Sequence, residues 1–161
     1  MKQRRLPLPL LALLSLYFTS TVILAEENGS QWQIHTSAYT QHYHYSPQHN
    51  DHQHLINIER YDSNNWLIGA AVFDNSFNQA SQYVYAGKIF HPINNLPDFH
   101  LKVTGGLIHG YKGAYKDKIP MNNLGVAPAI LPSIGYSYQQ ATSEIIFLGV
   151  AGAMLTIGYK F

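Results

Sequence analysis

Hydrophobic and polar residues alternate along most of the chain after residue 26, and this alternation predicts β-strands. In Gly152–Phe161 one set of alternate residues is Leu155, Ile157, Tyr159 and Phe161, and the other is Met154, Thr156, Gly158 and Lys160. Residues two apart share a face of a strand. We expect this strand to close an outer-membrane β-barrel, because such strands carry an apolar lipid face bordered by aromatic residues.

Eight segments show the same pattern, separated by turn-forming Asp, Asn, Pro and Gly. The predicted strands are Trp32–Gln41, Leu55–Tyr61, Trp66–Phe73, Ser81–Phe90, His100–Tyr111, Leu124–Tyr138, Ser143–Leu148 and Gly152–Phe161. Eight is an even number and the smallest common strand count for such barrels. We therefore predict an all-β fold, an eight-stranded antiparallel outer-membrane β-barrel that forms one monomeric domain over residues 26–161. A periplasmic β-sandwich is the alternative.

The predicted connections differ in length between the two ends of the barrel: two of the three periplasmic turns are short, and three of the four outer connections are longer than these two. The outer connections are His42–His54, Asp74–Ala80, Lys112–Asn123 and the short Gly149–Ala151, and the periplasmic ones are Asp62–Asn65, His91–Phe99 and Gln139–Thr142. Outer-membrane barrels have longer extracellular loops than periplasmic turns. A β-sandwich does not predict this asymmetry.

The first 25 residues have the pattern of a secretory signal peptide. Lys2, Arg4 and Arg5 precede an apolar stretch that ends at Ala25, where we expect cleavage. An uncleaved membrane anchor is the alternative. Removal leaves seven cationic against nine acidic side chains, a net charge of −2, which gives no support to a nucleic-acid partner. The chain has no cysteine, so stability must come from a core or from the lipid environment.

We expect the barrel interior to be apolar and lined by glycine. Trp66–Phe73 carries no charge, and the glycines that add space are Gly69, Gly87, Gly105, Gly106 and Gly158. An eight-stranded barrel holds side chains or one small ligand rather than an aqueous channel. A hydrocarbon chain would suit this interior, and a plainly packed lumen is the alternative.

Five of the nine histidines lie in the first outer loop: His42, His44, His49, His52 and His54. Neutral imidazole serves as a general base or a metal ligand. The spacing matches no standard zinc pattern and no cysteine assists, so we assign no metal or other cofactor. A polar surface loop is the alternative.

Two further polar groups fall on the same predicted rim. Asp74 and Ser76 would bring a carboxylate and a hydroxyl close to the histidines, and this set suits acyl transfer by an activated serine. An ordinary Asx turn is the alternative. The lysines of the third outer loop, Lys112, Lys116 and Lys118, are candidates for contact with lipid phosphates, or form a solvated loop.

The segments FDNSFNQ and APAILPSIGY resemble the PagP family of lipid A palmitoyltransferases. Within them, Ser76, Phe77 and Asn78 match the serine, the aromatic residue and the asparagine of the family pattern, and Pro128 and Pro132 match its two prolines. The resemblance implies an eight-stranded outer-membrane barrel that moves a palmitoyl chain from a phospholipid to lipid A. It also implies that Pro128 and Pro132 form a lipid gate, since proline removes a hydrogen-bond donor from the strand ladder.

The chain departs from the family pattern at the acid and at the base. The family aspartate aligns with Asn75, and Asp74 comes one residue early, which places it on the other strand face. A local match selects His35 as the base. The length of a membrane-spanning strand selects His42, with His44 as a further alternate.

The leading hypothesis is a PagP-like lipid A acyltransferase in the outer membrane, with no cofactor and with phospholipid and lipopolysaccharide as partners. His42 would be the base, Ser76 the hydroxyl that polarises or accepts the acyl group, and Asp74 an orienting carboxylate. The alternative is a non-enzymatic barrel that binds or transports a lipid, a small solute or a metal at the His-rich rim. The chain also resembles small outer-membrane proteins that sometimes carry a glycerol-3-phosphate transporter label, and the narrow lumen argues against that label.

Overall fold

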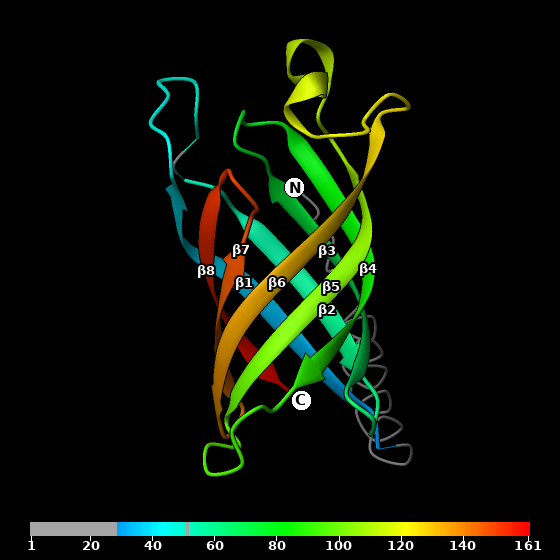
Figure 1. Ribbon diagram of the computed structural model, residues 1–161, viewed down its shortest axis with the longest axis vertical. Coiled ribbons are helices and arrows are strands. Elements are labelled where there is room, and N and C mark those ends of the chain that lie inside the picture. The colour runs from blue at the N-terminus through cyan, green and yellow to red at the C-terminus, as the bar shows by residue number, and fades with distance from the viewer. Residues whose placement is uncertain (1–28, 51) are drawn as a thin grey trace, which may run out of the picture.

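The computed structural model describes residues 29–50 and 52–161, so the predicted signal peptide lies outside the described residues. Eight antiparallel strands form one closed barrel in which each strand pairs with the next along the chain and β8 pairs with β1 (Figure 1). Closure confirms the predicted eight-stranded barrel. It rules out the β-sandwich, because a sandwich consists of two separate sheets, whereas here one sheet closes on itself and leaves no free edge strand.

All eight predicted strands are present, with bounds that differ from the prediction by at most two residues. They are β1 Gln31–His42, β2 Leu55–Tyr61, β3 Trp66–Asp74, β4 Ala80–Phe90, β5 Phe99–His109, β6 Val126–Tyr138, β7 Ala141–Phe147 and β8 Gly152–Lys160. A short 3-10 helix, η1 Gly113–Lys118, was not predicted. Within the described residues no helix is long and apolar enough to cross a membrane.

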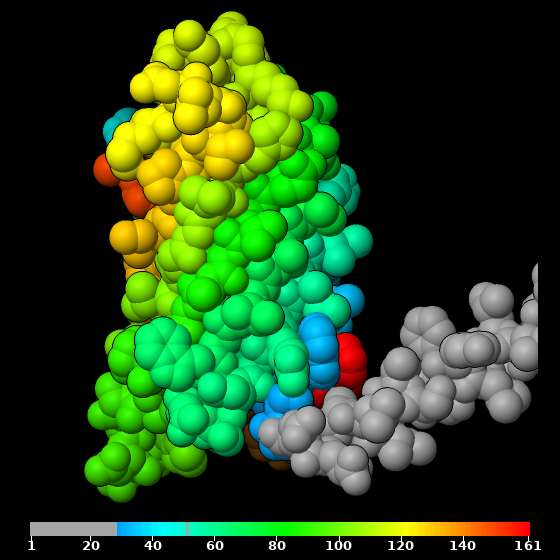
Figure 2. Space-filling view, turned by 90° about the vertical axis from the view of Figure 1, so that its right-hand side faces the viewer, coloured from blue at the N-terminus to red at the C-terminus, as the bar shows by residue number. Residues whose placement is uncertain are grey.

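The two longest connections, residues 43–54 and 110–125, lie at one end of the barrel, the upper end in Figure 1. The connections at this end are the outer ones of the prediction. They comprise residues 43–54, 75–79, 110–125 and 148–151, and the opposite end carries residues 62–65, 91–98 and 139–140. Figure 2 shows the segment between β5 and β6, in yellow, rising above the wall of the barrel. Since long loops lie outside the cell in such barrels, we call this the outer end and the opposite end the periplasmic end.

Side chains alternate between the lumen and the outer surface along each strand. On β8, Met154 and Thr156 are buried, whereas Leu155 and Ile157 point outward and Ile157 is 51% exposed. The outward set includes many large apolar side chains, among them Ile56, Ile68, Val84, Leu107 and Ile130. Such a belt suits a lipid surrounding, and the predicted faces of β8 are confirmed.

The interior is not uniformly apolar, and the predicted hydrocarbon-like lumen is wrong for its periplasmic half. Glu59, Lys102 and Glu144 are all buried there, and the ammonium of Lys102 contacts both carboxylates. These residues come from β2, β5 and β7. None of the three shares the inner face of its own strand with an oppositely charged side chain, so the pairing that makes its burial tolerable exists only across the barrel.

The interior glycines make room for neighbouring side chains. A Cβ atom on Gly69 would lie 2.5 Å from Cζ of Tyr85, and one on Gly158 would lie 2.8 Å from Nδ1 of His35. Both distances are too short for nonbonded carbon or nitrogen contacts. These glycines therefore admit an aromatic ring and an imidazole, where we had expected them to leave space for a ligand.

Gly106→Ala should destabilise the barrel by about 1–3 kcal/mol, the usual cost of overpacking. Its Cβ would lie 2.6 Å from Cβ and 2.7 Å from Cα of Tyr85, and would also meet the carbonyl oxygen of Val84. Urea unfolding in detergent micelles, followed by tryptophan fluorescence, measures the loss.

Gly105→Ala on the same strand is the matched control, since nothing lies within 4 Å of its added Cβ. Equal stability of the two variants would contradict the close approach of β4 and β5 at Gly106.

Candidate functional site

A β-bulge in β1 turns His42 into the barrel. Gln33 and His35, both odd-numbered, face the interior. The register between β1 and β8 shifts between Ser37 and Tyr39, and after this shift the even-numbered Thr40 and His42 are buried. One extra residue exchanges the two faces of a strand. Without the bulge, His42 would face the lipid, as Ile34 does.

An Asx turn positions Ser76 at the outer end of β3. Oδ1 of Asn75 accepts hydrogen bonds from the backbone N–H groups of Phe77 at 2.9 Å and Gln79 at 3.1 Å. Asn75 is buried. The turn that we had considered as an alternative explanation of this segment is therefore present, and it also presents Ser76 to β1.

His42 and Ser76 form a hydrogen-bonded pair, which we call the dyad. Nε2 of His42 lies 2.9 Å from Oγ of Ser76. Nε2 of Gln53 donates to the same Oγ at 3.1 Å, and the phenol of Tyr111 also hydrogen-bonds Ser76. Burial raises the pKa of Tyr111 above its ordinary value, against the smaller opposing effect of that hydrogen bond, so the phenol remains protonated at neutral pH.

An aromatic stack joins the outer loops over the dyad. The ring centroids of His42 and His49 are 4.3 Å apart, those of His49 and Phe77 are 5.5 Å apart, and those of Phe77 and Tyr115 are 4.2 Å apart. Ring contacts of this kind hold side chains from different loops in fixed relative positions.

A cavity of about 410 Å³ lies beneath Ser76, inside the outer half of the barrel. Its apolar lining includes Leu55, Phe73, Ile108, Leu131, Leu148 and Met154. Glu59 and Lys102 also contact it, so the charged side chains of the periplasmic half form its floor. The size lies within the usual range of ligand pockets, about 300–1,000 Å³.

The seam between β6 and β7 is unpaired at its outer end. In the described residues the β6–β7 ladder ends at the pair Ser133 and Ile146, whereas β6 pairs with β5 as far as Val126. Pro128 and Pro132 lie on or beside this stretch and point outward. Ile130 is 74% exposed on the outer surface and also lines the cavity. The cavity therefore reaches the lipid-facing surface at this seam.

The remaining predicted base candidates are not at the dyad. His44 is exposed in the first outer loop. His35 precedes His42 by seven residues, about 23 Å along a strand at about 3.3 Å per residue, and faces the charged floor. The structure thus brings together His42 and Ser76, the pair favoured by strand length.

Asp74 lies at the end of β3 and is engaged by another histidine. Its Oδ2 is 3.5 Å from Nδ1 of His54. Asp74 is partly exposed and Asn75 is buried. The two side chains therefore point to opposite sides of the barrel wall, as expected for adjacent residues. Lys112, Lys116 and Lys118 are exposed on the loop that contains η1.

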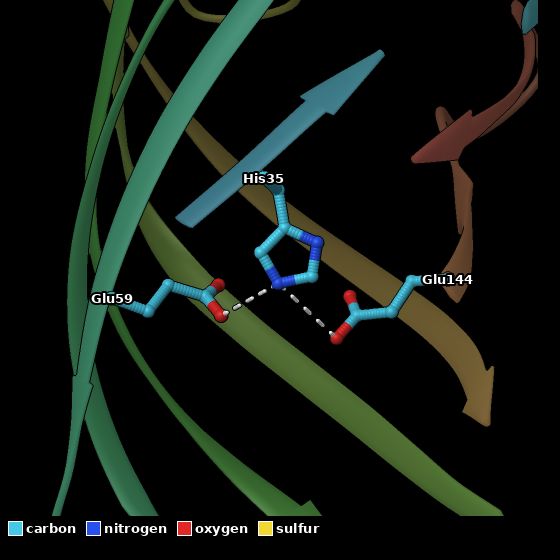
Figure 3. A group of neighbouring side chains, drawn as sticks. All are labelled: His35, Glu59 and Glu144. Atoms are coloured by element: carbon cyan, nitrogen blue, oxygen red, sulfur yellow. Dashed lines mark ion pairs between the residues drawn. The ribbon is translucent and has the colours of Figure 1, made fainter. Parts of the chain in front are cut away.

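The group with geometry for a metal, in the described part of the chain, is His35, Glu59 and Glu144 inside the barrel (Figure 3). Nε2 of His35 is 3.7 Å from Glu59 Oε2 and 4.0 Å from Glu144 Oε1. Nζ of Lys102 lies 2.9 Å from Glu59 Oε1 and 2.6 Å from Glu144 Oε2. The ammonium already supplies the positive charge that these carboxylates require, so a metal ion would have to displace it.

Two features of the site had no sequence signal. Gln53 hydrogen-bonds Ser76 from a loop that shows no alternating pattern. Tyr111 was predicted to be part of a strand, whereas β5 ends at His109 and Tyr111 lies in the loop that follows. Both side chains reach Ser76 only because the barrel brings three outer loops to one end.

No family model matches the chain, and no curated relative matches it. Among solved structures it is similar to a de novo designed transmembrane β-barrel, with 12% identity, a TM-score of 0.52 and coverage of 83% of this chain and 97% of that one. It is also similar to Ail, the attachment invasion locus protein of Yersinia pestis, solved with the heparin analogue sucrose octasulfate, with 15% identity, a TM-score of 0.45 and coverage of 82% and 97%. The likeness is one of fold. The closed barrel with an apolar outer belt places the protein in the outer membrane.

Lys102→Met should lower the free energy of unfolding by about 3–5 kcal/mol, because it leaves Glu59 and Glu144 buried without their cation. Urea unfolding in micelles tests this.

The triple variant Lys102→Met with Glu59→Gln and Glu144→Gln should regain most of the loss, since no uncompensated charge remains. Lys112→Met, in the exposed outer loop, is the control. A Lys102→Met barrel as stable as this control would show that the buried ion pairs contribute nothing.

Proposed function

We propose that the protein is an outer-membrane lipid acyltransferase that moves a fatty acyl chain from a phospholipid to lipid A. The observation that supports this most is the 2.9 Å hydrogen bond between His42 Nε2 and Ser76 Oγ at the mouth of an apolar cavity. A hydroxyl within hydrogen-bond reach of an imidazole is the arrangement of an activated nucleophile. The cavity would hold the acyl chain and place its ester carbonyl beside Ser76.

In the proposed reaction, His42 takes the proton of the Ser76 hydroxyl while Oγ attacks the donor's ester carbonyl. The ester C–O bond breaks, an acyl-serine forms, and the lysophospholipid alcohol leaves with the proton from His42. The hydroxyl of lipid A then gives its proton to His42 and attacks the acyl-serine. The new ester forms and Ser76 recovers its proton, so atoms and charge balance.

The amide of Gln53 would stabilise the negative oxygen that develops on the carbonyl. Its Nε2 donates toward the reacting Oγ, and preorganised donors at such an oxygen lower the barrier most in a site shielded from water. Asn75 holds the turn under Ser76. Asp74 contacts His54 and would thereby help to hold the first outer loop beside the dyad.

The β6–β7 seam would admit the donor from the bilayer. The ladder ends there, Pro128 and Pro132 provide no backbone donor, and the cavity contacts the exposed Ile130. Lys112, Lys116 and Lys118 would meet lipid phosphates above the membrane surface. This entry route agrees with the role implied by the PagP resemblance.

A barrel that binds lipid without reacting is the second candidate. The observation that favours it is the contact of Asp74 with His54, which engages the predicted orienting carboxylate away from the dyad. Such a protein would retain phospholipid in its cavity and leave lipid A unchanged. Transport of a solute is disfavoured, because the charged floor closes the periplasmic half of the lumen.

His42→Asn and Ser76→Ala should each reduce acyl transfer by at least about a hundredfold, the usual contribution of a general base. Mass spectrometry of lipid A from cells with and without the protein measures the acylated product.

His44→Asn is the control for His42→Asn, since His44 is an exposed histidine of the same loop. Lipid A with unchanged acylation in cells that contain the wild-type barrel would refute the enzymatic proposal, and lipid retained by the purified protein would then favour the second candidate.

Ala71→Leu should shift the preferred donor to a shorter acyl chain, because Ala71 lines the cavity and extra methyl groups would shorten it. Ala70→Leu, next to it on β3 but exposed on the outer surface, should leave the preference unchanged. Phosphatidylcholines of defined chain length, supplied one at a time, reveal the shift, and identical profiles for the two variants would show that the cavity does not hold the chain.

A further inference from the structure

Both tryptophans of the chain lie on the outer surface of the barrel at its periplasmic end. The sequence contains only two, Trp32 and Trp66, and they lie near the start of β1 and at the start of β3. Trp66 is 54% exposed, and the next outward side chain on its strand, Ile68, belongs to the apolar belt. Tryptophan favours the boundary between hydrocarbon and headgroups, because its ring has an apolar body and a polar N–H.

Each indole is paired with a cation on the neighbouring strand. Trp32 lies opposite Arg60 in the β1–β2 ladder, and Cζ of Arg60 is 5.9 Å from the centroid of the Trp32 ring. Trp66 lies opposite Lys88 in the β3–β4 ladder, and Nζ of Lys88 is 4.7 Å from the centroid of the Trp66 ring. Both distances are those of cation–π contacts. These contacts hold the two cations against the outer wall of the barrel.

Neither cation has an acidic partner in the described part of the chain, where no ion pair includes Arg60 or Lys88. One nitrogen of Arg60 lies 3.5 Å from Oγ of Ser30, so most of the five N–H donors of the guanidinium have no acceptor there. Asp62 is the acidic residue of the adjoining turn, and its Oδ1 accepts hydrogen bonds from two backbone N–H groups. Both positive charges are therefore available to an anion from outside the chain.

The opposite side of the barrel wall carries no comparable charge. The strands β5 to β8, all of them described, point no Lys, Arg, Asp or Glu outward. Lys160 at the end of β8 turns inward and donates a hydrogen bond to Oγ of the buried Ser137. Both indoles and both outward cations are thus concentrated on β1 to β4. We call the surface formed by Trp32, Arg60, Trp66 and Lys88 the periplasmic cation surface.

The register sets the distance between the two cations. Arg60 pairs with Ile68, which pairs with Ala86, and Lys88 lies two residues further along β4. With about 4.8 Å between neighbouring strands and about 3.3 Å per residue, the Cα atoms of Arg60 and Lys88 are roughly 12 Å apart. Since each cation is held over its own indole, each would meet a separate phosphate.

We propose that the periplasmic cation surface binds anionic phospholipids, with one phosphate against Arg60 and one against Lys88. Arginine bonds a phosphate through two parallel N–H groups, and lysine meets it as a point charge. The acyl chains of the same lipids would lie along the apolar belt, on outward residues such as Ile58 and Ile68. This surface lies on the outside of the barrel at the end opposite the dyad, so lipid binding there is independent of the proposed acyl transfer.

Quenching of tryptophan fluorescence by brominated phospholipids tests the proposal, because both tryptophans of the chain belong to the surface. The barrel is reconstituted in bilayers that contain brominated phosphatidylglycerol or brominated phosphatidylcholine, whose own ammonium neutralises its phosphate. The wild type should prefer the anionic lipid. Arg60→Gln and Lys88→Gln should each lower the ratio of the two binding constants about fivefold, the usual contribution of one cation near an anionic lipid surface.

Arg60→Lys and Lys112→Gln are the controls. Arg60→Lys keeps the charge and should retain most of the preference. Lys112 lies in an outer loop, beside η1, so Lys112→Gln removes the same net charge at the other end of the barrel and should behave as the wild type. Heat-modifiable gel migration shows that each variant has folded. Inorganic phosphate in the buffer should not displace the lipid, because it brings no chains to the apolar belt.

The proposal is overturned if the two brominated lipids quench the wild type equally, or if Arg60→Gln and Lys88→Gln keep the wild-type preference. An equal loss in Lys112→Gln would also refute it, since net charge rather than this surface would then attract the lipid. Displacement by inorganic phosphate would show an anion site that does not recognise a lipid.

Discussion

The closed ladder of backbone hydrogen bonds between β1 and β8 is the constraint on which the structure depends. Lipid offers no partner to a backbone N–H or C=O group, so a membrane-spanning sheet must pair every strand edge. Closure fixes which residues face the lumen, since side chains alternate strictly along a paired strand. The apolar belt, the charged floor and the placement of the dyad all follow from that alternation.

The two places where pairing is incomplete lie at the outer end, on either side of the dyad. The β6–β7 ladder ends at Ser133, and the β1–β2 ladder ends at Thr36. At the outer end, loops and solvent can hydrogen-bond the unpaired backbone N–H and C=O groups. The hydrocarbon at the bilayer centre offers no such partners. The spaces beside these seams are the apolar cavity and a polar depression of about 440 Å³ along the outer half of β1. Incomplete pairing thus leaves space beside a narrow barrel's outer end at two seams without widening the barrel.

The two halves of the lumen have different physical roles. Glu59, Lys102 and Glu144 join three strands through charge-assisted contacts inside the periplasmic half. The cavity of the outer half is lined by apolar side chains together with polar ones such as Gln53 and Asn57, and it reaches the charged floor at Glu59 and Lys102. A hydrocarbon chain entering from above would meet carboxylates that are already paired, so the floor limits depth without attracting the chain.

The amino-acid sequence by itself determined the strands, the loop asymmetry, the faces of β8 and the candidates His42 and Ser76, because alternation and turn chemistry are local properties. Only the tertiary structure decided that His42 faces inward, since the bulge after Ser37 appears in the register with β8 and in no local pattern. It also decided that three charged residues from different strands form one buried cluster, and that Gln53 and Tyr111 reach Ser76. Each of these depends on which strands and loops become neighbours, and barrel closure alone establishes that.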